Sequence, residues 1–196
     1  MILLIAVAIG LIAGLFRAWL TKRAYRVPGF KLIWIVFMAF LLQWFTFIFS
    51  PTRQLIPSGW AKTFLVGSLC LLLIFAWANR HLGGFWLLGI GLVLNLLVIA
   101  VNGGLMPISP DTAQLLIPQN SEYQFQPGQR FAFTKDIVLE TGLTKLWFLS
   151  DRFVTPNWLP CCIAYSFGDI LIGAGAFWLL WSMGGPAKPT KEVIRC

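Results

Sequence analysis

The chain has 196 residues, of which 58% are hydrophobic and only 11% are charged. Lys and Arg outnumber Asp and Glu by 15 to 7, which gives a net charge of +8, and the mean hydropathy is +0.79. Soluble domains carry about 25% charged residues. These values therefore exclude a disordered chain, a disulfide-stapled secreted domain and an ordinary cytosolic enzyme, and they predict an integral membrane protein of one domain.

A membrane-spanning helix needs about 20 mostly apolar residues. We predict an all-α membrane bundle with five transmembrane helices, at residues 1–20, 30–49, 63–79, 82–101 and 163–183. These spans form a single transmembrane domain, 1–183, in which one long structured outer loop, 102–162, joins the last two helices. Residues 184–196 form an inner C-terminal tail. The first span lacks a basic segment and a cleavage site ahead of Arg17, so we expect it to be a retained helix and not a signal peptide.

The distribution of Lys and Arg predicts the orientation of the spans. With the N-terminus outside, the inner side receives nine basic residues and one acid, whereas the outer side receives six basic residues and five acids. We therefore predict a multi-pass protein of the cytoplasmic membrane, with the N-terminus outside and the C-terminus inside. Membrane lipids are its expected partners, and the positive charge is not a nucleic-acid footprint.

The outer loop changes character along its length. Residues 106–129 are rich in Pro, Ser, Gln and Asn, which favours turns. In residues 137–149, Leu139, Leu143 and Leu146 recur at helical spacing, which predicts an amphipathic helix on the outer membrane face. The alternative is that this segment packs over the bundle as a lid.

Three polar side chains are predicted to lie at one depth in the outer half of the spans: Gln43, Asn95 and Asp169. Ser68 and Gly10 fall in the same layer, with Asn102 at its rim. An ionised carboxylate in hydrocarbon is costly, so Asp169 should face the bundle and have a partner. The layer is either a hydrogen-bond clasp between helices or a binding or proton-relay site.

Glycine spacing predicts close helix packing at Gly10, Gly14 and Gly168, since small residues four apart let helices approach. Gly103 and Gly104, directly after Asn102, are able to adopt positive φ and so to end a helix. Their exposed amides could instead hold an anion or a partner carbonyl.

The sequence contains no catalytic or metal-binding constellation, and no cofactor is predicted. His81 lies in a short inner turn, where a solvated side chain is favoured over an axial ligand to a pigment or haem. Cys70, Cys161, Cys162 and Cys196 have no spacing typical of a redox or metal site, so we interpret them as structural or free thiols.

The chain resembles an uncharacterised bacterial membrane family, domain of unknown function 5317, over roughly residues 1–182. The resemblance is carried by four segments: Gly10–Arg17, Asn95–Pro107, Leu146–Asp151 and Tyr165–Ile172. It implies a membrane domain of five or six spans with these motifs at its outer side, in a bacterial inner membrane. It implies no catalytic role.

We expect a non-catalytic accessory or scaffolding subunit that packs against other subunits of a larger membrane complex. A respiratory or photosynthetic assembly would be one host. The alternative is a small transporter or a lipid- or small-molecule-binding membrane protein that uses the Asp169 layer. An enzyme acting on lipid at the outer face is a third reading, for which Asp169 or the loop acids would have to supply the base.

Overall fold

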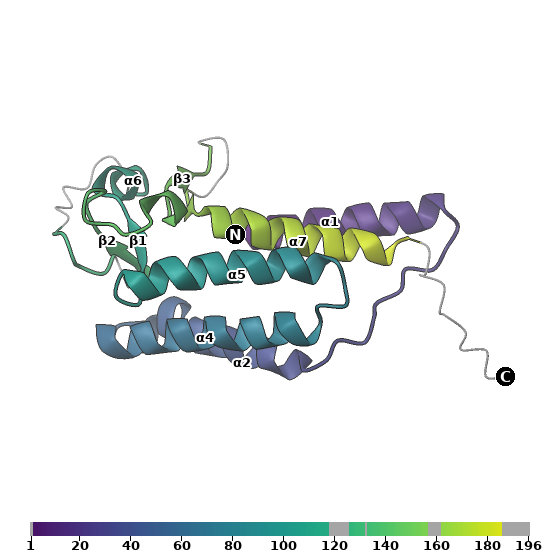
Figure 1. The fold of residues 1–196 in the computed structure, drawn as a ribbon, viewed down its shortest axis with the longest axis horizontal. Helices are drawn as coiled ribbons and strands as arrows, with labels where there is room; N and C mark the ends of the chain where they lie inside the picture. The colour runs from purple at the N-terminus through teal and green to yellow at the C-terminus, as the bar shows by residue number, and fades with distance from the viewer. Residues whose placement is uncertain (1, 118–125, 132, 157–161, 186–196) are drawn as a thin grey trace.

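The structure is a computed structural model that describes residues 2–117, 126–131, 133–156 and 162–185. It is mostly helical, with a small β-containing region at one end (Figure 1). The prediction of an all-α fold is therefore corrected: the outer loop and the first residues of the predicted fifth span contain two two-stranded sheets. The apolar helices carry the length of the molecule, and the loop covers one end of them.

Five apolar helices correspond to the five predicted spans. They are α1 (Ile2–Leu20), α2 (Ile33–Gln43) continued by a π-helical turn η1 (Trp44–Ile48), α4 (Ser58–Ala78), α5 (Gly84–Val101) and α7 (Phe167–Met183). Of the described helices, α1, α4 and α5 are long and apolar enough to cross a membrane, whereas Ile33–Ile48 and α7 are apolar but shorter. A short helix, α3 (Ser50–Arg53), turns the chain between η1 and α4.

The helices pack in the order α1, α7, α5, α4 and α2, which differs from their order in the chain. In Figure 1, α1 lies behind α7 and α2 lies behind α4, so the row is curved. Glycines bring its central pair close together. A β-carbon at Gly84 would lie 2.6 Å from the Gly175 carbonyl oxygen, and one at Gly91 would lie 2.5 Å from that of Gly168. The faces of α5 and α7 are thus in backbone contact.

The outer loop is a folded layer over one end of the row. β1 (Met106–Ile108) pairs in parallel with β2 (Asp136–Val138), with Pro107 opposite Ile137. β3 (Phe153–Val154) pairs antiparallel with β4 (Ala164–Tyr165), which leads into α7. A short helix α6 (Pro110–Leu115) and a 3₁₀ turn η2 (Trp147–Leu149) complete it. This region has a small buried cluster of its own, formed by Ile108, Ala113, Phe131, Val138 and Ala164. Leu105 and Met106 instead join the core between the helices.

The prediction of an amphipathic helix at residues 137–149 is wrong. The segment begins in β2, continues through turns and ends in η2, and Leu146 has a positive φ of 54°. Hydrogen bonding to β1 holds its first residues extended, which overrides the helical spacing of the leucines. Leu139 and Leu146 instead pack against the helical core. The alternative, in which the segment packs over the bundle, describes its position.

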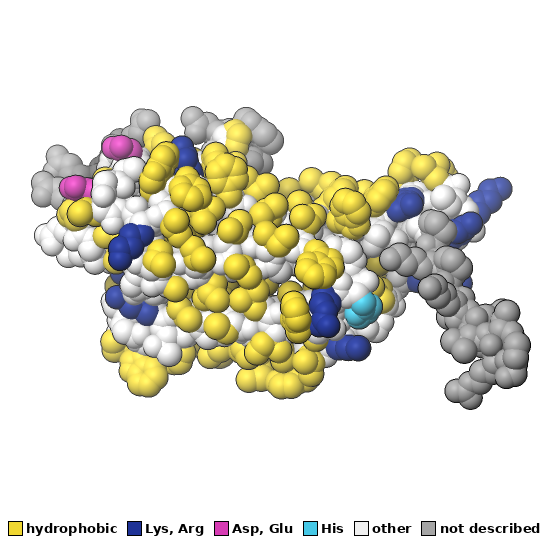
Figure 2. Space-filling model, in the orientation of Figure 1, with side chains coloured by type: hydrophobic (Ala, Val, Ile, Leu, Met, Phe, Trp, Pro, Cys, Tyr) yellow, Lys and Arg dark blue, Asp and Glu magenta, His cyan; other side chains and the backbone are white. Residues whose placement is uncertain are grey.

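The lateral surface of the helices is apolar. Figure 2 shows hydrophobic side chains covering the helices between two ends at which Lys and Arg gather. Trp19 is 72% exposed and Leu4 69%, and on α1 only Gly10, Gly14 and Ala18 are buried. Apolar surface on this scale is typical of contact with lipid or with another membrane protein.

Candidate functional site

Asp169 lies in the first turn of α7, directly after the N-terminal cap Ser166. Ser166 Oγ accepts a hydrogen bond from the Asp169 backbone N–H at 3.2 Å, and Asp169 Oδ2 accepts one from the Ser166 N–H at 3.1 Å. This reciprocal pair satisfies two backbone donors and places a carboxylate at the positive end of the helix dipole. α7 begins four residues later than the predicted span, because Ala164–Tyr165 is extended in β4.

Asn95 of α5 connects to both members of this cap. Its Nδ2 donates to Asp169 Oδ1 at 2.9 Å, and its Oδ1 accepts from Ser166 Oγ at 2.9 Å. Asn95 and Ser166 are buried, and the close glycine contact between α5 and α7 brings them within reach. Both Asp169 oxygens therefore have donors. This geometry is that of an interhelical clasp, a contact worth about 1 kcal/mol in a membrane.

Gln43, at the end of α2, makes a second and separate polar pair. Its Nε2 donates to Ser68 Oγ of α4 at 2.8 Å, and Ser68 donates in turn to the Leu65 carbonyl at 2.7 Å. The π-helical turn that follows Gln43 is contacted by the loop, because Arg130 Nη2 donates to the Thr46 carbonyl at 3.4 Å. The predicted polar layer thus consists of two pairs, Asn95 with Asp169 and Gln43 with Ser68.

Gln43 of one pair and both members of the other, Asn95 and Asp169, border one cavity of about 260 Å³ beneath the outer loop. Its polar wall contains Gln43, Asn95, Asp169 and Lys135. Its apolar wall comes from four of the helices, α1, α4, α5 and α7, through Ile2, Leu3, Leu69, Leu92, Ile99 and Ile172. The curved row of helices therefore encloses a space with one polar side, large enough for part of a small organic molecule.

Lys135 enters this cavity from the loop and was not predicted as a site residue. Its Nζ lies 2.6 Å from Asp151 Oδ2 and 3.6 Å from Asp136 Oδ1. The Asp151 side chain is 1% exposed, whereas Lys135 keeps 39% of its side-chain surface accessible and borders the cavity. The single ammonium thus faces carboxylates in the loop on one side and the cavity on the other.

The charges in this cluster shift one another's ionisation. Burial raises the pKa of Asp151 to about 7, and the negative charges of Asp136 and Asp169 act in the same direction against the attraction of Lys135. Burial alone would lower the pKa of Lys135, but attraction to Asp151, Asp136 and Asp169 outweighs it, and the pKa is raised. Lys135 therefore stays positively charged near neutral pH, and the pKa of Asp151 lies above its ordinary value.

Asp151 also borders a second, polar pocket of about 240 Å³ within the loop region. Ser109, Asp111, Thr112 and Arg152 lie on its wall. Asp151 Oδ1 is buried and has no hydrogen-bond partner within the described part of the chain. The Lys135–Asp151 ion pair therefore separates a polar pocket in the loop from the cavity between the helices.

Asn102, Gly103 and Gly104 lie away from the cavity wall and anchor the loop. Asn102 Nδ2 donates to the Lys145 carbonyl at 2.8 Å, and its Oδ1 accepts from the Lys145 N–H at 2.9 Å. Gly103 and Gly104 have φ of +84° and +93°, and a β-carbon at Gly104 would lie 2.9 Å from Lys62 Cβ. These residues end α5 and fix the start of the loop.

The remaining predicted residues are spread over the helices. Gly10 and Gly14 face α7, where a β-carbon at Gly10 would lie 2.8 Å from Phe177 Cα. Gly10 is therefore a packing residue and not a member of the polar layer. His81 lies in the turn between α4 and α5. Cys70 and Cys162 are free and exposed, while Cys161 and Cys196 lie outside the described residues.

The acidic and basic residues of the loop are what the sequence reasoning missed. Lys135, Asp136 and Asp151 are among the charged residues of the predicted outer side and were not singled out, although Asp151 ends one of the segments that carry the family resemblance. The available signal was the Lys-Asp pair directly before the apolar run Ile137-Val-Leu139. Such a run is typical of a buried strand, and its neighbours are drawn into the folded loop with it.

The fold is that of a mostly helical protein with membrane-length apolar helices and a folded loop at one end. The chain belongs to the family described as "Family of unknown function (DUF5317)", whose model matches residues 29–181. The N-terminal segment Gly10–Arg17, one of the four that carried the resemblance, lies outside this match. An uncharacterised protein from Thermotoga maritima is 31% identical over 176 residues, which cover 90% of this chain and 86% of that protein. No solved structure matches the chain.

Proposed function

We propose that this is a five-span protein of the bacterial inner membrane that binds a small amphipathic molecule in the cavity beneath its outer loop. The observation that carries the proposal is the convergence of Gln43, Asn95, Asp169 and Lys135 on one cavity. Three of these polar residues come from three different apolar helices and the fourth from the loop. A purely structural clasp between α5 and α7 requires only Asn95, Ser166 and Asp169.

The charge distribution supports five spans with the N-terminus outside. The five described acids are Asp111, Asp136, Glu140, Asp151 and Asp169, and all belong to the loop end. Of the described charged residues in the connections at the opposite end, all are basic, which is the pattern of a cytoplasmic face. Ile33–Ile48 and α7 extend about 24 to 26 Å at 1.5 Å per residue. A hydrocarbon core of about 30 Å accommodates helices of this length by local thinning.

The composition of the cavity wall selects the chemistry of the ligand. The apolar side chains favour a hydrocarbon or aromatic body, and the amide groups of Gln43 and Asn95 offer hydrogen bonds to a polar end. Lys135 already faces Asp151 and Asp136, and Asp169 also borders the cavity, so a strongly anionic end would meet several carboxyl groups beside one ammonium. A neutral or zwitterionic polar end fits this balance best.

The test compares two variants that remove the same hydrogen bond. Gln43→Ala and Ser68→Ala both break the α2–α4 pair, but of the two residues only Gln43 lines the cavity, while Ser68 is fully buried between helices. Each protein is purified in mild detergent, and small molecules released by denaturation are identified by mass spectrometry. We expect a molecule that co-purifies with the wild type and Ser68→Ala and is depleted in Gln43→Ala. Equal amounts in all three, or no such molecule in the wild type, would contradict the proposal.

A second candidate function is an accessory subunit of a membrane complex, and the exposure of α1 favours it. This helix packs extensively against α7 and presents most of its other surface outward. A subunit docked there would cover Leu4, Ile12, Phe16 and Trp19. Native gel sizing after gentle extraction tests it: a band of several hundred kilodaltons with stoichiometric partners supports this candidate, and a small particle contradicts it.

A further inference from the structure

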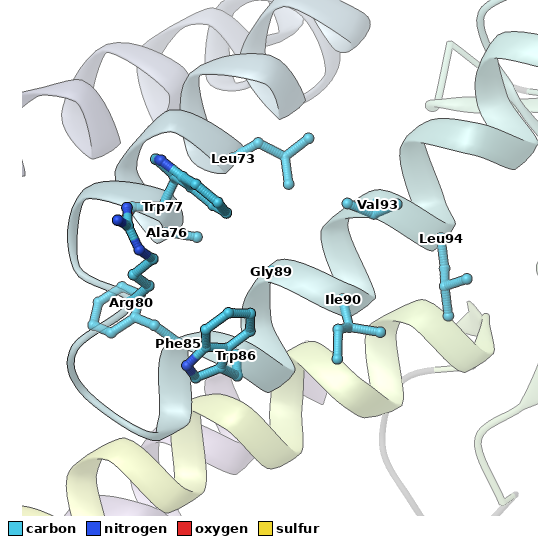
Figure 3. A pocket seen from close by; sticks show the side chains of 10 residues that line it. All are labelled: Leu73, Ala76, Trp77, Arg80, Phe85, Trp86, Gly89, Ile90, Val93 and Leu94. Carbon is cyan, nitrogen blue, oxygen red and sulfur yellow. The ribbon is translucent and has the colours of Figure 1, made fainter.

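A groove runs between α4 and α5 near the turn that joins them, at the opposite end of the helices from the loop. It has a volume of about 250 Å³, and Figure 3 shows the side chains that line it. Its walls are Leu73, Trp77, Phe85, Trp86, Ile90 and Val93. None of these side chains belongs to the cavity beneath the loop.

The groove exists because two small residues face each other across the helix pair. A β-carbon at Gly89 would lie 4.0 Å from the Ala76 Cβ and would touch nothing closer among the described residues. α4 and α5 therefore leave a channel where larger side chains would fill the space. The flanking Trp77, Trp86, Ile90 and Val93 are between 48% and 64% exposed, so the groove opens on the apolar lateral surface.

Arg80 closes the end of the groove that lies at the helix turn (Figure 3). Its guanidinium carbon lies 4.2 Å from the centre of the Trp77 ring, and Nη1 donates to the Trp77 carbonyl at 3.3 Å. Arg80 has no acidic partner within the described residues. The stacked guanidinium is thus held in place with donors left for an anion, an arrangement suited to phosphate.

We propose that this groove binds an anionic phospholipid, with an acyl chain between α4 and α5 and the phosphate on Arg80. Trp77 and Trp86 lie near the ends of α4 and α5 that meet at the turn, and tryptophan at the ends of apolar helices is typical of contact with lipid headgroups. All the charged residues in the described connections at this end are basic, which favours a lipid of net negative charge over a zwitterionic one. The inference rests on the membrane placement in the proposed function and is independent of the cavity beneath the loop.

The test uses native mass spectrometry of the detergent-purified protein, titrated with phosphatidylglycerol and, separately, with phosphatidylcholine. Gly89→Leu fills the groove without a backbone clash and should weaken binding of both lipids. Gly67→Leu is its control, because Gly67 lies in α4 with nothing within 4 Å of an added β-carbon and does not line the groove. Arg80→Gln should weaken phosphatidylglycerol binding roughly tenfold, the size of one charge-assisted hydrogen bond, and abolish the preference for it.

Arg23→Gln is the control for Arg80→Gln, because it removes an exposed positive charge in the connection after α1 that does not border the groove. It should bind like the wild type. Melting temperatures of all four variants establish that each is folded. Phosphatidylglycerol binding by Gly89→Leu at the wild-type level, or equal losses in Arg80→Gln and Arg23→Gln, would overturn the proposal. The proposal would also be overturned if the wild type bound neither lipid and instead co-purified with a membrane protein that was absent from purified Gly89→Leu. None of these results depends on what the other cavity binds.

Discussion

Gly168 lies directly against the amide group of Asn95. A β-carbon at position 168 would lie 2.6 Å from Asn95 Cγ and would overlap the amide oxygen. The same oxygen accepts the Ser166 hydroxyl, and the amide nitrogen donates to Asp169. The absence of a side chain at one position of α7 is thus what allows a polar side chain of α5 to reach the cap of α7.

Gly168→Ala should therefore destabilise the protein. The new methyl group displaces Asn95 and also meets the Gly91 carbonyl oxygen at 2.8 Å, so that α5 and α7 must separate. We expect a loss of about 1–3 kcal/mol, the usual range for overpacking, read as a lower Tm in detergent. Gly89→Ala on α5 is the control, because its β-carbon has room, and it should be neutral or slightly stabilising. Similar Tm values for the two variants would contradict the packing described.

Two substitutions of Asp169 distinguish a hydrogen-bond clasp from a site that needs the carboxylate charge. Asp169→Asn keeps the shape of the side chain and one of its two acceptor oxygens, and a 180° rotation of the Asn95 amide lets its oxygen accept from the new NH₂ group, so the change should cost about 1 kcal/mol. Asp169→Leu leaves Asn95 Nδ2 and the Ser166 N–H without their acceptor, so it should cost about 1–3 kcal/mol. Thermal unfolding in detergent measures both. A large loss of stability in Asp169→Asn would mean that the charge itself, and not the hydrogen bonding, holds this end of α7.

Asn79 is a structural residue at the other end of the molecule. It is fully buried, its Oδ1 accepts from the Lys31 N–H at 2.9 Å, and its Nδ2 donates to the carbonyls of Lys31 and Phe75. Asn79→Ala removes the only side chain that bonds both the N–H and the carbonyl of Lys31 among the described residues and leaves a cavity at a fully buried position, and we expect a loss of about 2 kcal/mol. Thr63→Ala, which removes an exposed hydroxyl bonded within α4, is a suitable control and should be close to neutral.

Stability should depend on pH through Asp151. Its pKa is about 7 in the folded protein and about 3.8 in an unfolded chain, so between these values the folded state binds more protons. The stabilisation is complete below about pH 4 and is lost as the pH rises through 7. Unfolding of the wild type and of Asp151→Asn, compared at several pH values between 4 and 8, checks this. The wild type should lose stability relative to the variant as the pH rises, and an opposite slope would show that Lys135 keeps Asp151 ionised.

The positions of the apolar helices could be predicted from the sequence, because long apolar runs have few alternatives. All five fall within a few residues of the predicted spans, although only α1, α4 and α5 meet the length expected of a span. Asn95 and Asp169 could be singled out for a related reason. Polar side chains are rare in such runs, and each needs a partner at a similar depth.

The loop could not be predicted in the same way. Its leucines have helical spacing, but β1 and β2, which pair in parallel, lie about 30 residues apart in the chain. The local spacing of apolar residues does not predict a contact over that distance. Lys135 reaches the cavity only because this pairing places it there. Asn79 was likewise read as the end of a span, since its bond to Lys31 depends on how the connection before α2 folds back.

The place of α7 in the row of helices bears on how the protein is made. α7 is the last apolar helix in the described part of the chain, and it lies between α1, the first, and α5. During synthesis the first helix therefore lacks its main packing neighbour until Phe167–Met183 has been made, and residues 21–32 connect it to α2. The Ile2–Leu3 side of the cavity is therefore completed last, and a chain that ends before α7 would leave its first helix without the neighbour that holds it.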